Sequence, residues 1–277
     1  MTLGRLQNLF LLLLMMGAAG CGDSPAADPT HNKLVITGSS TIAPLVLEMG
    51  KRFETRQSGI RVDVQTGGSS RGISDIRRKL ADIGMASRPL RKDEQDLFGT
   101  VIAYDGIGLI VHRSNSLSAL DQNEIKEIYT GVITNWKQVG GTDAPITVVN
   151  KAEGRATLDL FLQYFQLTNA QIRAHVVIGD NEQGIKTVAG NPYAIAYVSI
   201  GTAEYDAAHG VSIKLLRLGD IPASLKTVQE GRFPLSRPLT LVTQEIPTGV
   251  VKAFIDFAKS PEVHDLVTQQ YFVPLPG

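Results

Sequence analysis

One pattern recurs three times along this chain: a short apolar run ends in a polar turn, and a helical segment follows. The turns are rich in Gly, Ser, Thr or Arg and lie at residues 38–42, 67–73 and 150–158. Apolar runs that alternate with helical segments indicate βα units and a largely parallel sheet. In such open sheets, the strand ends and the following helix N-termini meet along one edge. The pattern therefore predicts an α/β fold in which the three turns can converge.

The stretch Gly38–Leu45, which contains the first of these turns, shows what such a junction can bind. The first turn of a helix has unpaired N–H groups and carries the positive end of the helix dipole. The hydroxyl groups of Ser40 and Thr41 add further donors, so the turn can bind an anion without a cationic side chain. A cap on the helix is the simpler interpretation of one turn. Three turns of the same build favour a shared anion site.

Periodicity gives the remaining elements that we expect. The expected strands are 33–37, 59–66, 82–85, 101–104, 106–112, 146–150, 194–198 and 238–243. The expected helices are 46–56, 73–80, 91–97, 121–129, 158–165, 249–258 and 261–270. No internal repeat interrupts this order.

The composition limits the kinds of partner. The chain has 277 residues, of which 43% are hydrophobic and 19% charged, so it can bury a sizeable core. Lys plus Arg and Asp plus Glu each number 27, and this balance argues against a nucleic-acid surface. Any anion must therefore be recognised locally.

The N-terminal residues predict export and a lipid anchor. Arg5 precedes an apolar run, Leu9–Met16, which is too short to span a bilayer and is typical of a signal peptide. Small residues lead to Cys21, the only cysteine, in a pattern that resembles the lipobox of bacterial lipoproteins. We expect a signal peptide over 1–20, lipidation of Cys21 and a flexible tether over 21–32. Ordinary cleavage with an incidental cysteine is the alternative.

A serine hydrolase is the less favoured alternative function. Residues 68–72 match the G-x-S-x-G nucleophile elbow between a strand and a helix, with Ser70 as nucleophile. Asp256 and His264 follow in the order that a serine hydrolase requires, but the oxyanion motif of that fold is missing. A short Gly/Ser pattern is also easily met by chance in a chain with 27 glycines.

No cofactor is expected from the sequence. The five histidines show no spacing that is typical of a metal site, and no G-x-G-x-x-G follows a strand. Two cations mark the third turn instead. Arg155 stands at the start of a helix, where the dipole disfavours a cation, and Lys151 lies four residues earlier. A bound anion, or the neighbouring Glu153, would compensate these charges.

Several motifs in order resemble the periplasmic phosphate-binding proteins of ABC phosphate importers, over about residues 33–275. The motifs are Thr37–Pro44 (TGSSTIAP), Gly67–Ile73 (GGSSRGI), Asp82–Arg88 (DIGMASR), Asp105–Ile107, Ile110–His112, Thr134–Trp136, Gly190–Pro192, Ala196–Val198 and Pro234–Leu239 (PLSRPL). The resemblance implies a type II periplasmic-binding-protein fold, in which two α/β lobes joined by two crossing strands close on a dehydrated phosphate.

The resemblance also implies domain boundaries. Lobe 1 would comprise residues 33–107 and 239–277, and lobe 2 residues 108–238. The two crossing strands would lie near 106–112 and 238–243.

Residue roles follow from the matching motifs. The resemblance implies that Thr41 and Ile42 give phosphate their N–H groups, with the Thr41 hydroxyl, and that Ser69 or the neighbouring Ser70 donates too. The expected oxyanion ligands are Ser40, Thr41, Ile42, Ser69, Ser70, Arg88, Asp105, Lys151, Arg155, Ala156 and Thr157.

Departures from the family pattern leave the choice of oxyanion open. The family has Arg-x-x-x-Ser-Gly-Thr in the third turn, where this chain has Lys151, Arg155, Ala156 and Thr157. Lys cannot form the bidentate contact of Arg, although Arg155 could restore it. Arg88 stands where some members carry an Asp that accepts the proton of phosphate, and Asp105 could replace that acceptor. Phosphate is the first choice, and another tetrahedral oxyanion such as sulfate or molybdate is the second.

The resemblance finally implies the setting. The expected partners are the oxyanion, the membrane permease of an ABC importer and a bacterial membrane reached through lipid on Cys21. The protein would be a monomeric carrier in the periplasm or on the cell surface, without enzymatic activity or nucleic-acid binding.

Overall fold

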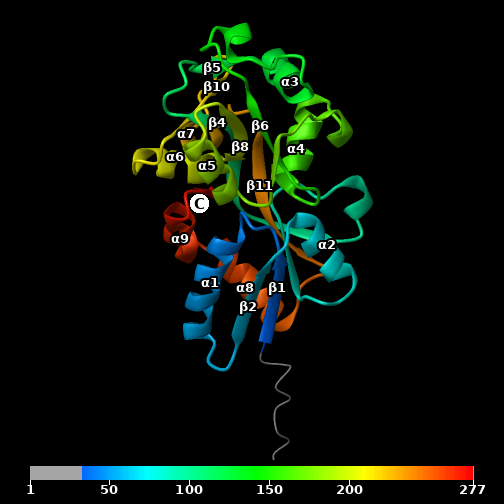
Figure 1. Cartoon of the computed structure of the whole chain (residues 1–277). Coiled ribbons are helices and arrows are strands. Elements are labelled where there is room, and N and C mark those ends of the chain that lie inside the picture. Colours follow the sequence, from blue (N-terminus) through cyan, green and yellow to red (C-terminus); the bar gives the residue numbers. More distant parts are fainter. Residues whose placement is uncertain (1–32, 277) are drawn as a thin grey trace, which may run out of the picture. The chain divides into compact units, whose positions relative to one another are not determined.

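The computed structural model describes residues 33–276 (Figure 1). The predicted signal peptide at 1–20, the lipidation site Cys21 and the tether at 21–32 lie outside the described residues. Among the helices within 33–276, none has both the length and the apolar character that crossing a membrane requires.

Strands and helices alternate along most of the chain. The strands are β1 (Lys33–Gly38), β2 (Arg61–Thr66), β3 (Ile83–Ala86), β4 (Phe98–His112), β5 (Ala119–Leu120), β6 (Thr147–Lys151), β7 (Val176–Ile178), β8 (Ala194–Ser199), β9 (Ile213–Leu215), β10 (Arg217–Leu218), β11 (Ser236–Thr243) and β12 (Val273–Pro274). The α-helices are α1 (Ala43–Arg56), α2 (Ser69–Arg77), α3 (Gln122–Thr130), α4 (Ala156–Phe165), α5 (Asn181–Gly190), α6 (Ile200–Ala208), α7 (Leu225–Gln229), α8 (Gly249–Lys259) and α9 (His264–Gln269). Short 3₁₀ turns are η2 (Lys92–Glu94), η3 (Trp136–Val139), η4 (Asn169–Gln171) and η5 (Pro261–Val263).

The sheet contains two parallel groups joined by antiparallel strands. Its order is β2-β1-β3-β11-β4-β8-β6-β7, with β9 and β12 also paired to β4. Strand β1 pairs in parallel with β2 and β3, and β6 pairs in parallel with β7 and β8. The joining strands β11 and β4 run antiparallel to each other and to their neighbours β3 and β8. The predicted α/β class is confirmed.

Strand β4 passes from one lobe to the other. Its first part, up to Gly106, pairs with β11, and Ile107–Val111 pairs with β8. Each lobe has its own core on either side of this strand. The lobe 1 core gathers residues of β1, α1, α8 and α9, including Leu34 and Phe254. The two-lobed fold that the sequence predicted is therefore present.

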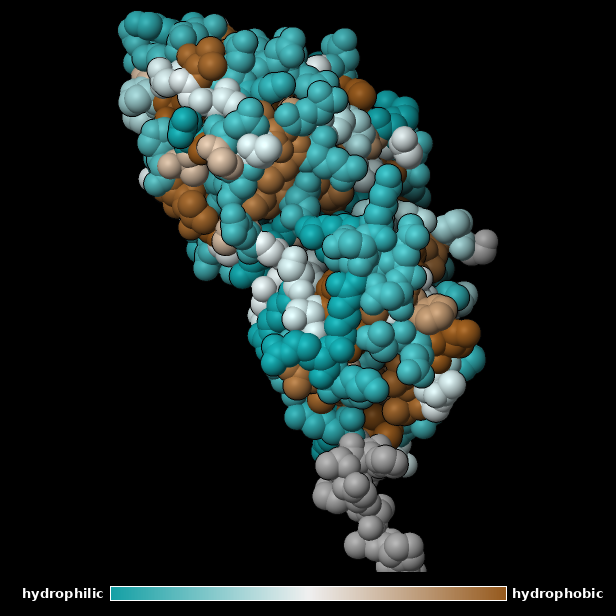
Figure 2. All heavy atoms as spheres, turned by 90° about the vertical axis from the view of Figure 1, so that its right-hand side faces the viewer, coloured by the Kyte–Doolittle hydropathy of each residue, from teal (hydrophilic) through white to brown (hydrophobic). Residues whose placement is uncertain are grey.

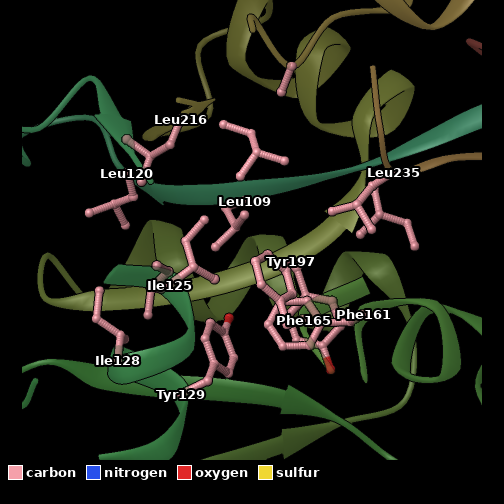
Figure 3. Close-up of a cluster of buried hydrophobic side chains, with 14 of the residues drawn as sticks. Leu109, Leu120, Ile125, Ile128, Tyr129, Phe161, Phe165, Tyr197, Leu216 and Leu235 are labelled. Atoms are coloured by element: carbon pink, nitrogen blue, oxygen red, sulfur yellow. The ribbon is translucent and has the colours of Figure 1, made fainter. Parts of the chain in front are cut away.

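Aromatic side chains fill the lobe 2 core (Figure 3). Phe161 of α4 stacks on Tyr197 of β8, with ring centroids 4.0 Å apart and planes 8° apart. Tyr129 of α3 packs on the same phenylalanine at 4.6 Å. Offset aromatic pairs add to the hydrophobic stabilisation of a core. They fix α4 on the sheet, and with it the position of the α4 N-terminus.

The molecular surface is mostly hydrophilic on the face that Figure 2 shows, where hydrophobic residues form separate patches on both halves. Large exposed hydrophobic residues such as Leu80, Val132 and Ile246 come from different parts of the chain. The apolar residues are thus concentrated in the cores, as expected for a folded domain.

Some expected elements were wrong in extent or kind. The strands expected at 101–104 and 106–112 form the single strand β4, because β11 and β8 pair with it in succession. The helix expected at 91–97 is only the 3₁₀ turn η2. Helix α2 begins at Ser69, inside the expected turn. The sequence interpretation also missed α5 and α6.

Candidate functional site

The three predicted turns line one small cavity. The volume of this cavity is about 10 Å³. Both lobes contribute residues. The lining residues are Ser39, Ser40, Thr41, Gly68, Ser69, Ser87, Lys151, Arg155, Ala156, Thr157, Gly179, Asp180 and Asn181. The structure thus brings together seven expected ligands: Ser40, Thr41, Ser69, Lys151, Arg155, Ala156 and Thr157.

The helices that begin at the predicted turns have no side-chain cap. Helices α1, α2 and α4 lack a capping hydrogen bond at their N-termini, whereas Asp121 caps α3 and Ser224 caps α7. Within residues 33–276, no acceptor meets the backbone N–H of Thr41, Ala156 or Thr157. Unpaired N–H groups at a helix start favour an anion. Neither Ser40 nor Thr41 caps α1, although the Ser39 hydroxyl accepts from the N–H of Ile42.

A fourth helix N-terminus reaches the cavity from α5. Asp180 caps this helix by accepting from the N–H of Gln183 at 2.8 Å. The segment Gly179–Asn181 lines the cavity, although no residue in it was expected there. Its signal was the Asp cap before a helical segment, and that signal is common to many helices.

Lys151 is the buried cation of the cavity. The residue is only 2% exposed, and its Nζ donates to the Asp180 carbonyl at 2.6 Å and to Asn181 Oδ1 at 3.2 Å. Burial, together with the charges of Arg237 and Arg155, lowers the pKa of Lys151 to about 7, and Asp180 opposes this change. A bound anion would favour the charged form.

Arg155 crosses the cleft between the lobes. It belongs to lobe 2, and its Nη1 donates to the hydroxyl of Ser40 in lobe 1 at 3.3 Å. A second crossing contact joins the N–H of Ser70 to the Gly154 carbonyl at 3.2 Å. Gly68 has a φ of +98°, and a Cβ there would lie 2.7 Å from the same carbonyl. The close approach of the lobes therefore requires glycine at this position.

Arg237 lies beside the cavity and was not expected in the site. Its Nη1 donates to Thr157 Oγ1 at 2.9 Å and to Ser87 Oγ at 3.4 Å, and both of these hydroxyls line the cavity. Its Nε and Nη2 donate to Asp105 Oδ2 at 3.1 and 2.7 Å, and both side chains are fully buried. The motif Pro234–Leu239 contained the signal, but nothing in it assigned a role to the arginine.

Asp105 is an ion-pair partner rather than an oxyanion ligand in this geometry. One carboxylate oxygen accepts from Arg237 and the other from Ser199 Oγ at 2.9 Å. Asp105 does not line the cavity. The sequence analysis expected Asp105 to supply the missing acceptor for the phosphate proton. In this geometry it does not, because both carboxylate oxygens already have partners.

Arg88, which was expected to be an oxyanion ligand, also lies outside the cavity lining. Its guanidinium pairs with Glu94 through contacts of 2.6 and 2.7 Å and lies outside the cavity lining. Ile42 is buried, and its N–H points to Ser39 Oγ at 3.4 Å. Ser70 uses its N–H for the contact with Gly154. The structure brings none of these three expected ligands into the cavity lining.

Charged side chains also join the lobes at α4. Asp159, in the first turn of α4, accepts from Arg91 Nη2 at 2.5 Å and lies 3.3 Å from Arg88 Nε. Both arginines belong to lobe 1, so the carboxylate joins the lobes next to the helix N-terminus that faces the cavity. We refer to Arg88, Arg91 and Asp159 as the interlobe latch.

The hydrolase constellation does not form a triad here. Ser70 contacts the Gly154 backbone, and the Asp256 carboxylate accepts from Lys252. In the described part of the chain, no hydrogen bond joins Ser70, Asp256 and His264 to one another. No group of three or more His, Cys, Asp or Glu within 33–276 has the geometry of a metal site.

Comparison with known proteins agrees with this geometry. A family model described as the PBP superfamily domain matches residues 23–262. The phosphate-binding protein PstS of Bacillus subtilis is 28% identical, over 97% of this chain and 94% of its own length. The PstS of Borreliella burgdorferi is 29% identical, over 97% of this chain and 99% of its own length.

Solved structures agree as well. A phosphate ABC transporter substrate-binding protein from Clostridium perfringens, solved with bound phosphate, is 32% identical with a TM-score of 0.82. That likeness covers 88% of this chain and all of the other. An ABC-type phosphate transport receptor from Vibrio cholerae is 28% identical with a TM-score of 0.75, over 88% of this chain and 100% of its own. The chain belongs to the PBP superfamily.

Proposed function

We propose that this protein captures inorganic phosphate between its two lobes and delivers it to an ABC importer. The observation that carries the proposal is the cavity itself, where uncapped helix N-termini of both lobes and the buried Lys151 meet. Helix N-termini and buried cations replace the water of an anion at low desolvation cost. The relatives that match nearly the whole chain are phosphate-binding proteins, which favours phosphate among the tetrahedral oxyanions.

Thr41, Ala156 and Thr157 would offer backbone N–H groups, and Ser39, Ser69 and Ser87 hydroxyl groups. Arg155 would add a cation from the edge of the cleft. Arg237 would orient the hydroxyls of Thr157 and Ser87. The hydroxyl groups that line the cavity can accept from a protonated phosphate, so the cavity has acceptors although Asp105 is engaged elsewhere.

The transport setting is also part of the proposal. Closing the lobes on the anion excludes solvent and creates a form that a permease can distinguish from the open one. We propose lobe 1 as residues 33–107 with 239–277 and lobe 2 as 108–238, because the lobe 1 core follows this division and the lobe 2 core departs from it only at Ile107 and Val273. A lipid on Cys21 would hold the monomeric protein on the outer side of a bacterial membrane. Binding would involve no covalent step, so the protein would not act as an enzyme.

Isothermal titration calorimetry tests the ligand. Phosphate is expected to bind with a dissociation constant at or below about 1 μM, equivalent to about −8 kcal/mol. Arsenate, which has the same charge and shape, should bind more weakly, and sulfate and molybdate should bind weakly or not at all. Arg155→Ala should weaken phosphate at least tenfold, and Arg113→Ala, on the surface of lobe 2, should not. Tighter binding of sulfate than of phosphate would identify sulfate as the ligand. No heat of binding with any oxyanion would refute the proposal.

The interlobe latch gives a kinetic prediction. Asp159→Asn keeps the shape of the side chain but removes the charge that joins Arg88 and Arg91 to α4. We expect phosphate to dissociate about 3- to 10-fold faster, because partly exposed ion pairs contribute about 1 kcal/mol. Stopped-flow release measures this rate. Asp143→Asn, which removes an ion pair to Lys137 within lobe 2, is the control and should leave the rate unchanged. Equal rates in both variants would show that the latch does not hold the closed form.

A further inference from the structure

The ammonium group of Lys151 has two partners, and both belong to the start of α5. Its Nζ donates to the Asp180 carbonyl at 2.6 Å and to Asn181 Oδ1 at 3.2 Å. An ammonium group has three N–H donors. The third has no partner among residues 33–276, although Lys151 is buried and lines the cavity. The contacts with α5 therefore leave one donor of the ammonium for an anion.

The amide group of Asn181 has one favourable orientation. Its Oδ1 accepts from Lys151 Nζ and also from the backbone N–H of Ser199 at 3.3 Å. Both neighbours are donors, so a turned amide would place its NH₂ group against them and lose both hydrogen bonds. The amide oxygen is thereby fixed toward the ammonium group.

Ser199 connects Asn181 to the buried ion pair beside the cavity. Ser199 is fully buried at the end of β8, and its hydroxyl donates to Asp105 Oδ1 at 2.9 Å. Asp105 in turn pairs with Arg237, which donates to two hydroxyl groups of the cavity. Asn181 therefore belongs to one hydrogen-bonded network with the groups that orient these hydroxyls.

The two acceptors of the ammonium group are neutral. One is a backbone carbonyl, and the carboxylate of the same residue, Asp180, caps α5 at Gln183 N–H. The other is the amide of Asn181. No carboxylate within 33–276 forms an ion pair with Lys151. A carboxylate at position 181 would offset the ammonium charge and repel an anion in the cavity. Neutral acceptors hold the ammonium group and leave its charge for the ligand.

A lysine needs such support more than an arginine does. Its ammonium group is a point charge on a flexible stem, whereas the guanidinium group of arginine is a planar fork with fixed donor directions. Donors that are already oriented stabilise an anion without reorganisation. The start of α5 thus gives Lys151 a fixed direction that its own side chain lacks.

We propose that Asn181 is a positioning residue of the oxyanion site. It acts through Lys151, because it directs the third N–H of the ammonium group to the anion and does not compensate its charge. This inference rests on the proposed function, because it concerns the same cavity.

A double-mutant cycle with inorganic phosphate tests the inference. Isothermal titration calorimetry compares the parent chain, Asn181→Ala, Lys151→Met and the double variant. Asn181→Ala should weaken phosphate binding about 5- to 10-fold in the parent, because the ammonium group loses one of its two partners. In the Lys151→Met background the same change should alter the affinity by less than about twofold. A purely structural role of Asn181 in α5 would lower the affinity by the same factor in both backgrounds.

Asn181→Asp tests the need for a neutral acceptor. Aspartate has the shape of asparagine and keeps an acceptor for Lys151, but it adds a negative charge. We expect this variant to bind phosphate at least about tenfold more weakly than the parent, and more weakly than Asn181→Ala. Asn115 is the matched control, because its amide oxygen accepts from Leu117 N–H at 2.9 Å outside the cavity lining. Alanine and aspartate at position 115 should leave the affinity unchanged.

Three results would overturn the inference and leave the proposed function intact. The first is an equal loss from Asn181→Ala in both backgrounds. The second is parental affinity in Asn181→Asp, and the third is parental affinity in Lys151→Met. Absence of phosphate binding by the parent chain would instead refute the proposed function, and this inference with it.

Discussion

Replacing Lys151 by methionine is expected to weaken phosphate binding about 100- to 1,000-fold and to stabilise the ligand-free protein. The two effects have one cause. A charge-assisted hydrogen bond in a closed cavity contributes roughly 3–4 kcal/mol to anion binding when its loss leaves the partner unpaired. Without the anion, the same ammonium is buried beside Arg237 and Arg155, and methionine of similar length removes that cost.

The pH dependence of stability gives a second readout of Lys151. Burial lowers its pKa from 10.5 to about 7 in the folded protein, while the unfolded chain keeps the ordinary value. Between these two values the unfolded chain binds more protons, so stability should rise with pH over this window. Below pH 7 the full cost of the buried charge remains. Bound phosphate should raise the folded pKa of Lys151, so the increase in stability with pH should be smaller when phosphate is bound.

Thermal unfolding of parent and variant across that pH range measures both effects. Lys151→Met should melt a few degrees higher than the parent at pH 7, and the gap should narrow as the pH approaches 10. Lys252→Met removes an exposed lysine of α8 and is the matched control, expected to change neither affinity nor the pH profile. Undiminished phosphate affinity in Lys151→Met would remove Lys151 from the site. A lower melting temperature would contradict the cost assigned to its burial.

The sequence predicted the part of the site that depends on local pattern. Each strand–turn–helix junction is encoded in about ten consecutive residues, and parallel strands bring the junctions to one edge of the sheet. Thr41, Ser69 and Thr157 lie in such stretches, where the family resemblance implied their roles, and the structure places all three at one cavity. The expected helix starts differ from the observed ones by a few residues, as α2 shows. The reason is that hydroxyl residues fit both a turn and a first helical turn.

The remaining part depends on pairing between distant residues. Arg88 and Asp105 have charges that suit an oxyanion site, and their sequence neighbours gave no reason to exclude them. Their partners decide their role: Glu94 and Asp159 hold Arg88, and Arg237 holds Asp105 from 132 positions away. No local periodicity predicts such a pair. The same is true of the interlobe contacts, which exist only because the crossing strands bring the lobes together.

The buried pair of Arg237 and Asp105 leads to the largest stability effect that we expect. Arg237→Met should lower the free energy of unfolding by about 3–5 kcal/mol, because it leaves the Asp105 carboxylate buried with only Ser199 as a partner. Urea unfolding should show a lower midpoint with an unchanged slope. Arg232→Met breaks an exposed pair with Glu230 and should cost less than about 1 kcal/mol.

A double variant separates the pair from the side-chain volume. Arg237→Met/Asp105→Leu removes both charges, so it should recover much of the stability that the single variant loses. Phosphate affinity should stay low in the double variant, because Thr157 and Ser87 lose the guanidinium that orients their hydroxyls. If the double variant were as unstable as Arg237→Met, packing rather than the unpaired carboxylate would explain the loss. If it bound phosphate like the parent, Arg237 would have no positioning role.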